Sequence, residues 1–326
     1  MIAVLGGAGI TVRVRMIPQE EEYESPVMGD VFDYGTLNVA AKVACGDEIV
    51  IENSGSAFNI ACHLADMGRD VAFASVVADD AAGRAVLAQL KKSGIDTSCV
   101  QMVEGSTPAQ VEMLNVLNDP QMVFGNSKLY EAMTADMAAR WTDILDSAEA
   151  IVIDGSLPGE TLEYITSKYA VDDGRKLFFD PADHAGAVNA KDLIGRFYCV
   201  MPGRAEAEAM LRKTVLSADQ LMEAGAALEE KGVRKTVITI KGGGLYYKAG
   251  LEEGILAPER VLSFAATSGA GDMVSAAVVA ADLEGKTMEE TGAFAMKKAA
   301  EFLEGRSDER LIDKLNEKTQ EVNDGR

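Results

Sequence analysis

The chain of 326 residues is poor in basic residues and in histidine. Its 31 lysines and arginines face 52 aspartates and glutamates, and only two histidines are present. The net charge of −21 repels phosphate backbones and anionic lipid surfaces, so we expect no nucleic-acid partner and no membrane partner. A small anion responds to the local field instead, and binds where N–H groups and a divalent cation offset the charge. With only His63 and His184 available, catalysis based on histidine is poorly supplied.

Long apolar runs and paired cysteines are also missing from the sequence. No stretch approaches the roughly 20 residues that a membrane-spanning helix needs, and the N-terminus lacks the basic start of a secretory signal. The four cysteines, Cys45, Cys62, Cys99 and Cys199, stand far apart, and a chain of this size needs no disulfides. Cys62 is followed by His63, but a zinc site needs more ligands than these two. We therefore expect a cytoplasmic protein with reduced thiols.

Short runs rich in β-forming residues alternate with helical patterns along the chain. The runs expected to form strands are residues 2–5, 71–77, 150–154, 176–180, 197–201 and 236–240. The helical patterns cover residues 57–67, 81–93, 136–147, 159–169, 205–211 and 218–231. This alternation predicts an α/β fold with a doubly wound, mostly parallel sheet flanked by helices. In such sheets ligands bind beyond the carboxyl ends of the strands, so motifs that follow strands matter most.

Two segments depart from this rhythm. Residues 10–16 alternate apolar and polar side chains, which is typical of a half-exposed strand, and residues 109–117 are also strand-like. Both fit a small second sheet that projects from the main domain. Arg13 and Arg15 on the first segment either grip an anionic substrate or, as is commoner, face solvent or a second copy. The charged tail 305–326 is interpreted as a solvated helix, and no repeat or linker divides the chain, so one domain is expected over residues 1–326.

The strongest signal for a functional site is the hexapeptide TSGAGD at residues 267–272, followed by the helical run MVSAAVVAADL. Its glycines therefore stand at a helix N-terminus, where unpaired N–H groups and the helix dipole attract anions. Asp272 in the first turn is placed to accept a proton from an attacking hydroxyl while the N–H groups stabilise phosphoryl oxygens. On these six residues alone, a loop in which Asp272 only caps the helix is an equally good interpretation.

The surrounding sequence favours the catalytic interpretation. The GAGD segment resembles the signature of the ribokinase-like (PfkB) sugar kinase family, and SGSAFNIA at residues 54–61, followed by HLADMG, resembles its GGxxxNxAxxLxxLG signature. Further matching segments follow in the order usual for the family: residues 76–98, residues 106–114, the step Asp180-Pro181 and MPGRAEAE at residues 201–208. The resemblance runs from about residue 2 to residue 304. Within the family, DGSLPGE and MPGRAEAE look closest to the pseudouridine-kinase branch.

This resemblance implies a ribokinase-like fold with a small β lid contributed by about residues 10–50 and 101–126. It implies phosphoryl transfer from ATP, with Mg²⁺, to a hydroxymethyl group of a small sugar or nucleoside, with Asp272 as general base. The other implied roles are an anion hole of Gly269, Ala270 and Gly271, a substrate site with Thr11, Gly55 and Asn59, an ATP site with Thr267, Ser268, Lys241 and Gly244, and a metal site organised by Glu206. An exposed lid edge often pairs with another copy, so a homodimer through the lid is our hypothesis.

Four positions depart from the family pattern. Thr11 stands where an aspartate is usual, Ser54 replaces a glycine, Gly203 replaces an asparagine, and Lys241 stands where a glycine is usual. Because Asp272 is retained, we favour an active kinase of unusual specificity. The alternative is a catalytically weak protein of the same fold that binds a sugar or nucleotide.

A dinucleotide-binding oxidoreductase is disfavoured. The segment IAVLGGAGI opens with a strand and glycines, but Val12 stands where the fingerprint needs its third glycine. The following ITVRVRM is strand-like where a helix should receive the pyrophosphate.

Overall fold

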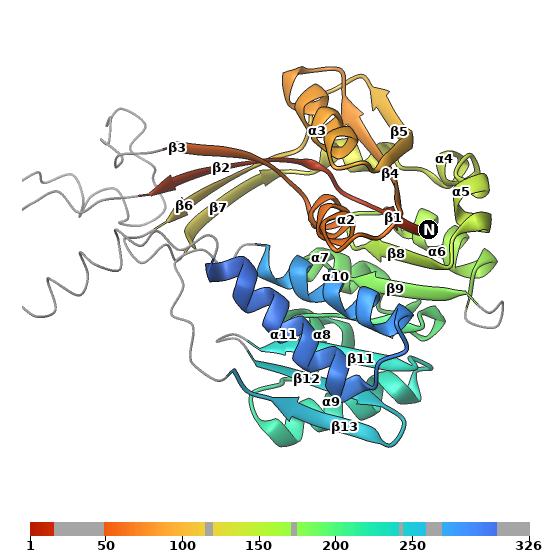
Figure 1. Ribbon diagram of the computed structural model, residues 1–326, viewed down its shortest axis with the longest axis vertical. Helices are drawn as coiled ribbons and strands as arrows, with labels where there is room; N and C mark the ends of the chain where they lie inside the picture. Colours follow the sequence, from red (N-terminus) through yellow and green to blue (C-terminus); the bar gives the residue numbers. More distant parts are fainter. Residues whose placement is uncertain (16–48, 115–119, 171–174, 241–243, 259–268, 305–326) are drawn as a thin grey trace, which may run out of the picture.

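The computed structural model describes residues 1–15, 49–114, 120–170, 175–240, 244–258 and 269–304. These residues form a nine-stranded sheet of order β13-β12-β11-β10-β9-β8-β1-β4-β5 and a four-stranded sheet of order β3-β2-β6-β7. Figure 1 shows the small sheet projecting away from the large one. No helix in these ranges is long and apolar enough to cross a membrane.

The large sheet is parallel over most of its width. Its strands are β1 (Ile2–Leu5), β4 (Val71–Ala78), β5 (Asp96–Val103), β8 (Ala150–Asp154), β9 (Lys176–Asp180), β10 (Cys199–Val200), β11 (Lys235–Ile240), β12 (Gly244–Ala249) and β13 (Glu252–Leu256). Neighbours from β5 to β11 pair in parallel, whereas β12 and β13 pair antiparallel. Strands β1, β4 and β8 are buried along their whole length, as their continuous apolar runs predict for a sheet covered on both faces.

Helices cover both faces of the large sheet. One face packs against α2 (Ser56–Asp66), α3 (Ala81–Lys92), α10 (Ala270–Leu283) and α11 (Met288–Glu304). The other packs against α4 (Ala135–Ala139), α5 (Thr142–Ser147), α6 (Gly159–Lys168), α7 (His184–Ala190), α8 (Arg204–Leu211) and α9 (Ala218–Glu230), with the short 3₁₀ helices η1 (Lys128–Ala132) and η3 (Ile194–Arg196). Alternation along β1 shows the two layers, because Ile2 and Val4 belong to the first core and Ala3 and Leu5 to the second.

The small sheet forms the lid. It consists of β2 (Gly9–Arg15), β3 (Ile49–Ser54), β6 (Ala109–Leu114) and β7 (Pro120–Asn126). Strands β2 and β6 pair in parallel, and the two outer pairs are antiparallel. The predicted fold class, a mostly parallel sheet flanked by helices with a small β lid, is therefore confirmed.

Several predicted boundaries were wrong. The lid segment 101–126 starts too early, because residues 101–103 complete β5 and pair with β4 in the large sheet. The predicted helix 136–147 is two helices, interrupted where Trp141 turns into the core with 1% of its surface exposed. The strand predicted at 197–201 is reduced to β10. The predicted tail helix 305–326 and most of the lid segment 10–50 lie outside the described residues.

A buried charge cluster ties α10 to the amino ends of β9 and β11. The Asp282 carboxylate accepts hydrogen bonds from Lys176 Nζ and Lys235 Nζ, each at 2.7 Å, and from the Tyr198 hydroxyl at 3.1 Å. Burial alone would raise the pKa of Asp282, but the two lysine hydrogen bonds outweigh burial and hold this pKa below its ordinary value. The cluster therefore stabilises the folded chain at neutral pH.

Asp282→Asn should lower the free energy of unfolding by about 2 kcal/mol at pH 7, because it weakens two charge-assisted hydrogen bonds. The loss stays moderate since the lysine side chains are 35% and 22% exposed and can turn toward water. Urea unfolding measures the change. The matched control is Glu284→Gln on the same helix end, whose ion pairs are more exposed and should contribute less than about 1 kcal/mol. Equal losses in the two variants would contradict this account.

Candidate active site

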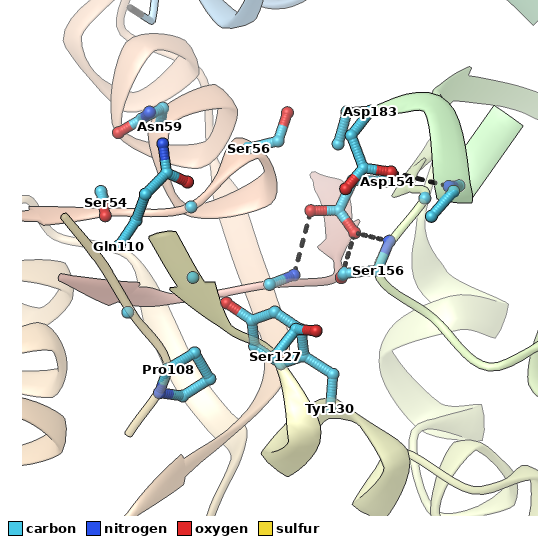
Figure 2. A pocket seen from close by; sticks show the side chains of 18 of the residues that line it. Ser54, Ser56, Asn59, Pro108, Gln110, Ser127, Tyr130, Asp154, Ser156 and Asp183 are labelled. Carbon is cyan, nitrogen blue, oxygen red and sulfur yellow. Dashed lines mark hydrogen bonds between the residues drawn. The ribbon is translucent and has the colours of Figure 1, made fainter. Parts of the chain in front are cut away.

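A cavity of about 840 Å³ lies beneath the lid, at the carboxyl ends of β1 and β8. Its walls come from the lid strands, the N-terminal turns of α2, α7 and α10, and the segments that follow β1, β8 and β9. The polar residues among its lining include Thr11, Ser54, Ser56, Asn59, Gln110, Asn126, Ser127, Tyr130, Glu131, Asp154, Ser156, Asp183, Asn189 and Asp272. Figure 2 shows that many of these side chains converge from distant parts of the chain. The cavity lies where parallel α/β sheets bind ligands.

Asp272 stands in the first turn of α10 and lines this cavity. Both of its carboxylate oxygens are held by α2: Ser56 Oγ donates to Oδ1 at 2.6 Å, and Asn59 Nδ2 donates to Oδ2 at 2.7 Å. The two signatures found in the sequence therefore meet, although more than 210 residues separate them. Asn59, predicted to contact substrate, acts here on the orientation of Asp272.

The predicted anion hole is the N-terminus of α10. Gly269 is the N-cap with φ 87°, a left-handed conformation that favours glycine, and among the described residues no side chain caps this helix end. Gly269 and Gly271 line the cavity, and a side chain at 271 would extend into open space. The N–H groups of Ala270 and Gly271 have no acceptor within the helix because they lie in its first turn. This end of α10 is thus suited to an anion.

Thr11 and Gly55 also line the cavity. Thr11, on β2, is buried and donates from Oγ1 to Ser54 Oγ at 2.7 Å, which joins two of the positions that depart from the family pattern. Gly55 is the N-cap of α2 with φ 117°, and a side chain there would overlap the carbonyl oxygen of Gly7. Glycine is therefore required at position 55 by both conformation and space.

Of the remaining predicted residues, the two that the structure describes, Gly244 and Glu206, are not among the residues that line the cavity. Thr267, Ser268 and Lys241 lie outside the described residues. Gly244 begins β12 and pairs with Ile240 at the carboxyl end of β11. Glu206 is in the first turn of α8, and its carboxylate folds back against Gly203 so closely that a side chain at 203 would overlap it.

Arg13 is neither a free anion-binding group nor a solvent-facing one. Its guanidinium forms ion pairs with Glu52 and with Glu112, the latter at 2.7 Å, and its side chain is 11% exposed. The interpretation of Arg13 as a solvent-facing residue was therefore wrong, and the ion pairs do not favour a free anion-binding group. The contact of this strand with a second copy stays a prediction. The side chain of Arg15 lies outside the description.

Asp154, which sequence reasoning did not assign a role, is the most fully hydrogen-bonded group of the site. It ends β8, is 1% exposed, and accepts at Oδ2 from the backbone N–H groups of Gly7 (3.0 Å) and Ala57 (2.9 Å). At Oδ1 it accepts from the backbone N–H of Ser156 (2.9 Å) and from the Ser156 hydroxyl. Burial raises the pKa of Asp154, and these hydrogen bonds oppose the rise. Its position at the end of a buried strand was the available signal.

Tyr130 was also missed. It lies on η1, and its hydroxyl lies close to Gly7 on the cavity wall. Figure 2 shows the Tyr130 side chain near Ser156. Burial and the charge of Asp154 raise the pKa of Tyr130, so it is a neutral donor at physiological pH.

A second buried carboxyl is Asp180, which ends β9 and contacts α10 through Ser275. It accepts from Ser275 Oγ at 2.5 Å and from the Ala182 N–H at 2.8 Å. Burial, together with the negative charge of Asp272, raises the pKa of Asp180 to about 7. In an unfolded chain the same carboxyl has a pKa of about 4.

Between about pH 4 and pH 7 the folded protein holds a proton on Asp180 that the unfolded chain has lost. Stability from this group therefore falls as the pH rises through that window and is constant above it. Asp180→Asn removes the cost of burying the charge, so the variant should melt at a higher temperature than the parent at pH 8. The difference should shrink toward pH 5. Thermal unfolding at several pH values measures it, and a lower melting temperature for the variant at pH 8 would contradict the assignment.

Comparison with known proteins agrees with this site. A family model described as pfkB family carbohydrate kinase matches residues 26–312. Pseudouridine kinase of Escherichia coli (strain K12) is 26% identical over 239 residues, which cover 73% of this chain and 75% of the relative. Ribokinase from Thermotoga maritima has a similar structure, with a TM-score of 0.74 and 18% identity, covering 92% of this chain and 91% of the other. The structure of a ribokinase II from E. coli in complex with ATP and Mg²⁺ gives a TM-score of 0.70 and 16% identity, covering 92% and 91%.

The family match spans most of the sequence, and the fold and the meeting of its two signatures at one cavity agree with it. The chain belongs to the pfkB family of carbohydrate kinases and is a carbohydrate or nucleoside kinase.

Proposed function

We propose that this kinase transfers the γ-phosphoryl group of ATP to a hydroxymethyl group of a small sugar or nucleoside, with Asp272 as general base. The observation that supports this most is the placement of Asp272 at the cavity, with Ser56 and Asn59 fixing its two oxygens. A carboxylate held in one orientation can accept the proton of a substrate hydroxyl as its oxygen attacks phosphorus. Phosphoryl transfer otherwise depends on positioning and on stabilising the phosphoryl oxygens.

The donor side of the reaction is assigned to the N-terminus of α10. In this proposal the phosphoryl oxygens lie against Gly269–Gly271, where the first-turn N–H groups and the helix dipole oppose the developing negative charge. The space beside Gly271 supports this, because apart from its chain neighbours and its own helix backbone no atom of the described residues lies within 4 Å of a Cβ atom placed there, so these residues leave room for a phosphate. The predicted nucleotide contacts Thr267, Ser268, Lys241 and Gly244 stay predictions.

Kinases of this family use ATP with Mg²⁺. Within the part of the chain that the structure describes, no group of three or more His, Cys, Asp or Glu side chains is placed to hold a metal. Mg²⁺ keeps several water ligands and is usually held by one or two carboxylates and the substrate phosphates, so it does not need such a group. We assign Glu206 as the residue that organises the ion, which would neutralise charge on the phosphates when bound.

The acceptor side is assigned to the lid half of the cavity. Thr11 and Gly55 line it, and Tyr130 and Ser156 face it from η1 and from the turn after β8. The similarity to a pseudouridine kinase makes pseudouridine the first acceptor to test.

A coupled ADP-release assay with ATP and Mg²⁺ tests the proposal. It compares pseudouridine, adenosine, cytidine, ribose, fructose and 2-keto-3-deoxygluconate, and a signal that depends on the acceptor is expected for at least one of them. The chain without acceptor is the control. If none of the acceptors gives a signal while ATP still binds, the alternative of a catalytically weak sugar- or nucleotide-binding protein gains support.

We also propose a homodimer through the lid. Register places Val12, Ile51, Val111 and Phe124 on one face of the small sheet, and the last three are 67%, 36% and 51% exposed. An apolar face of this kind is typical of a protein interface. Light scattering at micromolar concentration should give twice the chain mass of 34.6 kDa, and a monomer mass would contradict the dimer.

A further inference from the structure

Three of the six hydroxyl groups among the described residues of the cavity wall donate their protons within the wall itself. The Ser56 hydroxyl donates to Asp272, the Ser156 hydroxyl donates to Asp154, and Thr11 donates to Ser54. Each hydroxyl carries one proton and two lone pairs. Once its proton is engaged, the oxygen can offer only lone pairs to a ligand.

Two of the amides that line the cavity, Asn59 on α2 and Gln110 on β6, each use one NH₂ proton within the wall and keep a second one. A third amide, Asn126 on β7, accepts at Oδ1 from the backbone N–H of Lys128 at 3.1 Å. Asn59 Nδ2 donates to Asp272, and Gln110 Nε2 donates to Glu112 Oε1 at 2.9 Å. These orientations follow from chemistry, because an ionised carboxylate can only accept and must face the NH₂ group. The carbonyl oxygens of both amides are therefore available toward the cavity, where Figure 2 shows Gln110 beside Asn59.

The charges of the wall have one sign. Among the described residues that line the cavity, Glu131, Asp154, Asp183 and Asp272 are acidic and none is Lys, Arg or His. The nearby cation on the inner face of the lid, Arg13, is paired with two glutamates. A ligand at the lid end therefore meets negative charge and neutral hydrogen-bonding groups, and a carboxylate on that ligand would find no counter-charge from the described residues that line the cavity.

We infer that the acceptor is an uncharged polyhydroxy compound recognised through neutral hydrogen-bonding groups, and that acceptors bearing a carboxylate are rejected by the negative charge of the wall. The hydroxyls of Ser54, Ser127 and Tyr130 remain able to donate to neutral oxygens of such a compound, but they carry no charge. The N–H groups at the N-terminus of α10 serve the phosphates. This inference rests on the proposed function for the identity of the ligand as acceptor, and it narrows the substrate class to neutral sugars and nucleosides.

The test compares two pairs of compounds that differ chiefly in charge: 2-keto-3-deoxygluconate with its primary amide, and orotidine with uridine. Dissociation constants are measured by calorimetry on the full chain, with Mg²⁺ and a non-hydrolysable ATP analogue. In at least one pair the neutral member should bind at least about tenfold more tightly at low salt, and the ratio should fall as salt screens the wall. Carboxylate members that bind as tightly as, or more tightly than, their neutral partners overturn the inference. So does the absence of binding by both neutral members.

The same binding measurements are repeated on the variant Gln110→Lys. A cation at this position should reduce the preference for the neutral member, whereas Gln101→Lys on β5, outside the cavity lining, should leave the ratio unchanged. Because binding is measured apart from ADP release, the two proposals fail separately. Neutral ligands that bind but are never phosphorylated would remove the kinase mechanism and keep this inference. Turnover of 2-keto-3-deoxygluconate in preference to every neutral acceptor would overturn this inference and keep the kinase mechanism.

Discussion

Asp272→Asn is expected to lower the turnover number by a factor of about 10²–10⁴ while leaving the affinity for ATP largely unchanged. Asparagine has nearly the same size and can still accept a hydrogen bond from Ser56, so the first turn of α10 should keep its conformation. It cannot take up a proton from the attacking hydroxyl, and the loss of a positioned general base typically has an effect of this size. The first-turn N–H groups of α10 are unchanged, so the site that we propose for the phosphates is kept.

Turnover is measured by ADP release, and nucleotide affinity by calorimetry on the same preparations. The matched control is Asp136→Asn, which changes an exposed aspartate in the first turn of α4, far from the cavity lining. This control should retain full activity. Turnover of Asp272→Asn within a few-fold of the parent would remove Asp272 from the role of base, whereas parallel losses of turnover and ATP binding would indicate a damaged helix end.

The sequence predicted those parts of the molecule that local patterns determine. Buried runs such as residues 150–154 gave the central strands, and strict alternation at residues 10–16 gave the first lid strand. The position of Asp272 followed from glycines directly before a helical run. The hairpin of β12 and β13 was not predicted, because the segment 244–256 mixes glycine and charge with its apolar residues.

The interactions of the site could not be predicted because they join residues far apart in the chain. Asp154 accepts hydrogen bonds from Gly7, 147 residues away in the sequence, and from Ala57, 97 residues away. No local sequence pattern predicts either hydrogen bond. Arg13 shows the same limit, since its partners Glu52 and Glu112 come from two other strands. Sequence reasoning identified the carboxylate that we propose as general base, whereas only the structure identifies the groups that hold this carboxylate in place.

Asp154→Ala is expected to lower the free energy of unfolding by about 3 kcal/mol and to lower turnover as well. The substitution leaves the N–H groups of Gly7, Ala57 and Ser156, and the Ser156 hydroxyl, without their acceptor. An unsatisfied buried donor costs about 1–3 kcal/mol. Relief of the burial of the carboxylate, which raises its pKa, offsets part of the sum. Urea unfolding at pH 7 measures the change, and Asp154→Asn, which keeps one acceptor oxygen, should lose less.

The loss of turnover follows from the position of Ala57 in the first turn of α2. Asp154 fixes the same turn that carries Ser56, and the next turn carries Asn59, so a shift of α2 would release Asp272. We therefore expect Asp154→Ala to lower kcat more than it raises KM for ATP, measured at a temperature where the variant is fully folded. Ser156→Ala removes one of the four donors and none of the contacts to α2, so it should retain most of the turnover. If Ser156→Ala loses as much kcat as Asp154→Ala, Asp154 does not act through α2, because a variant that leaves the helix contact intact would then be equally impaired.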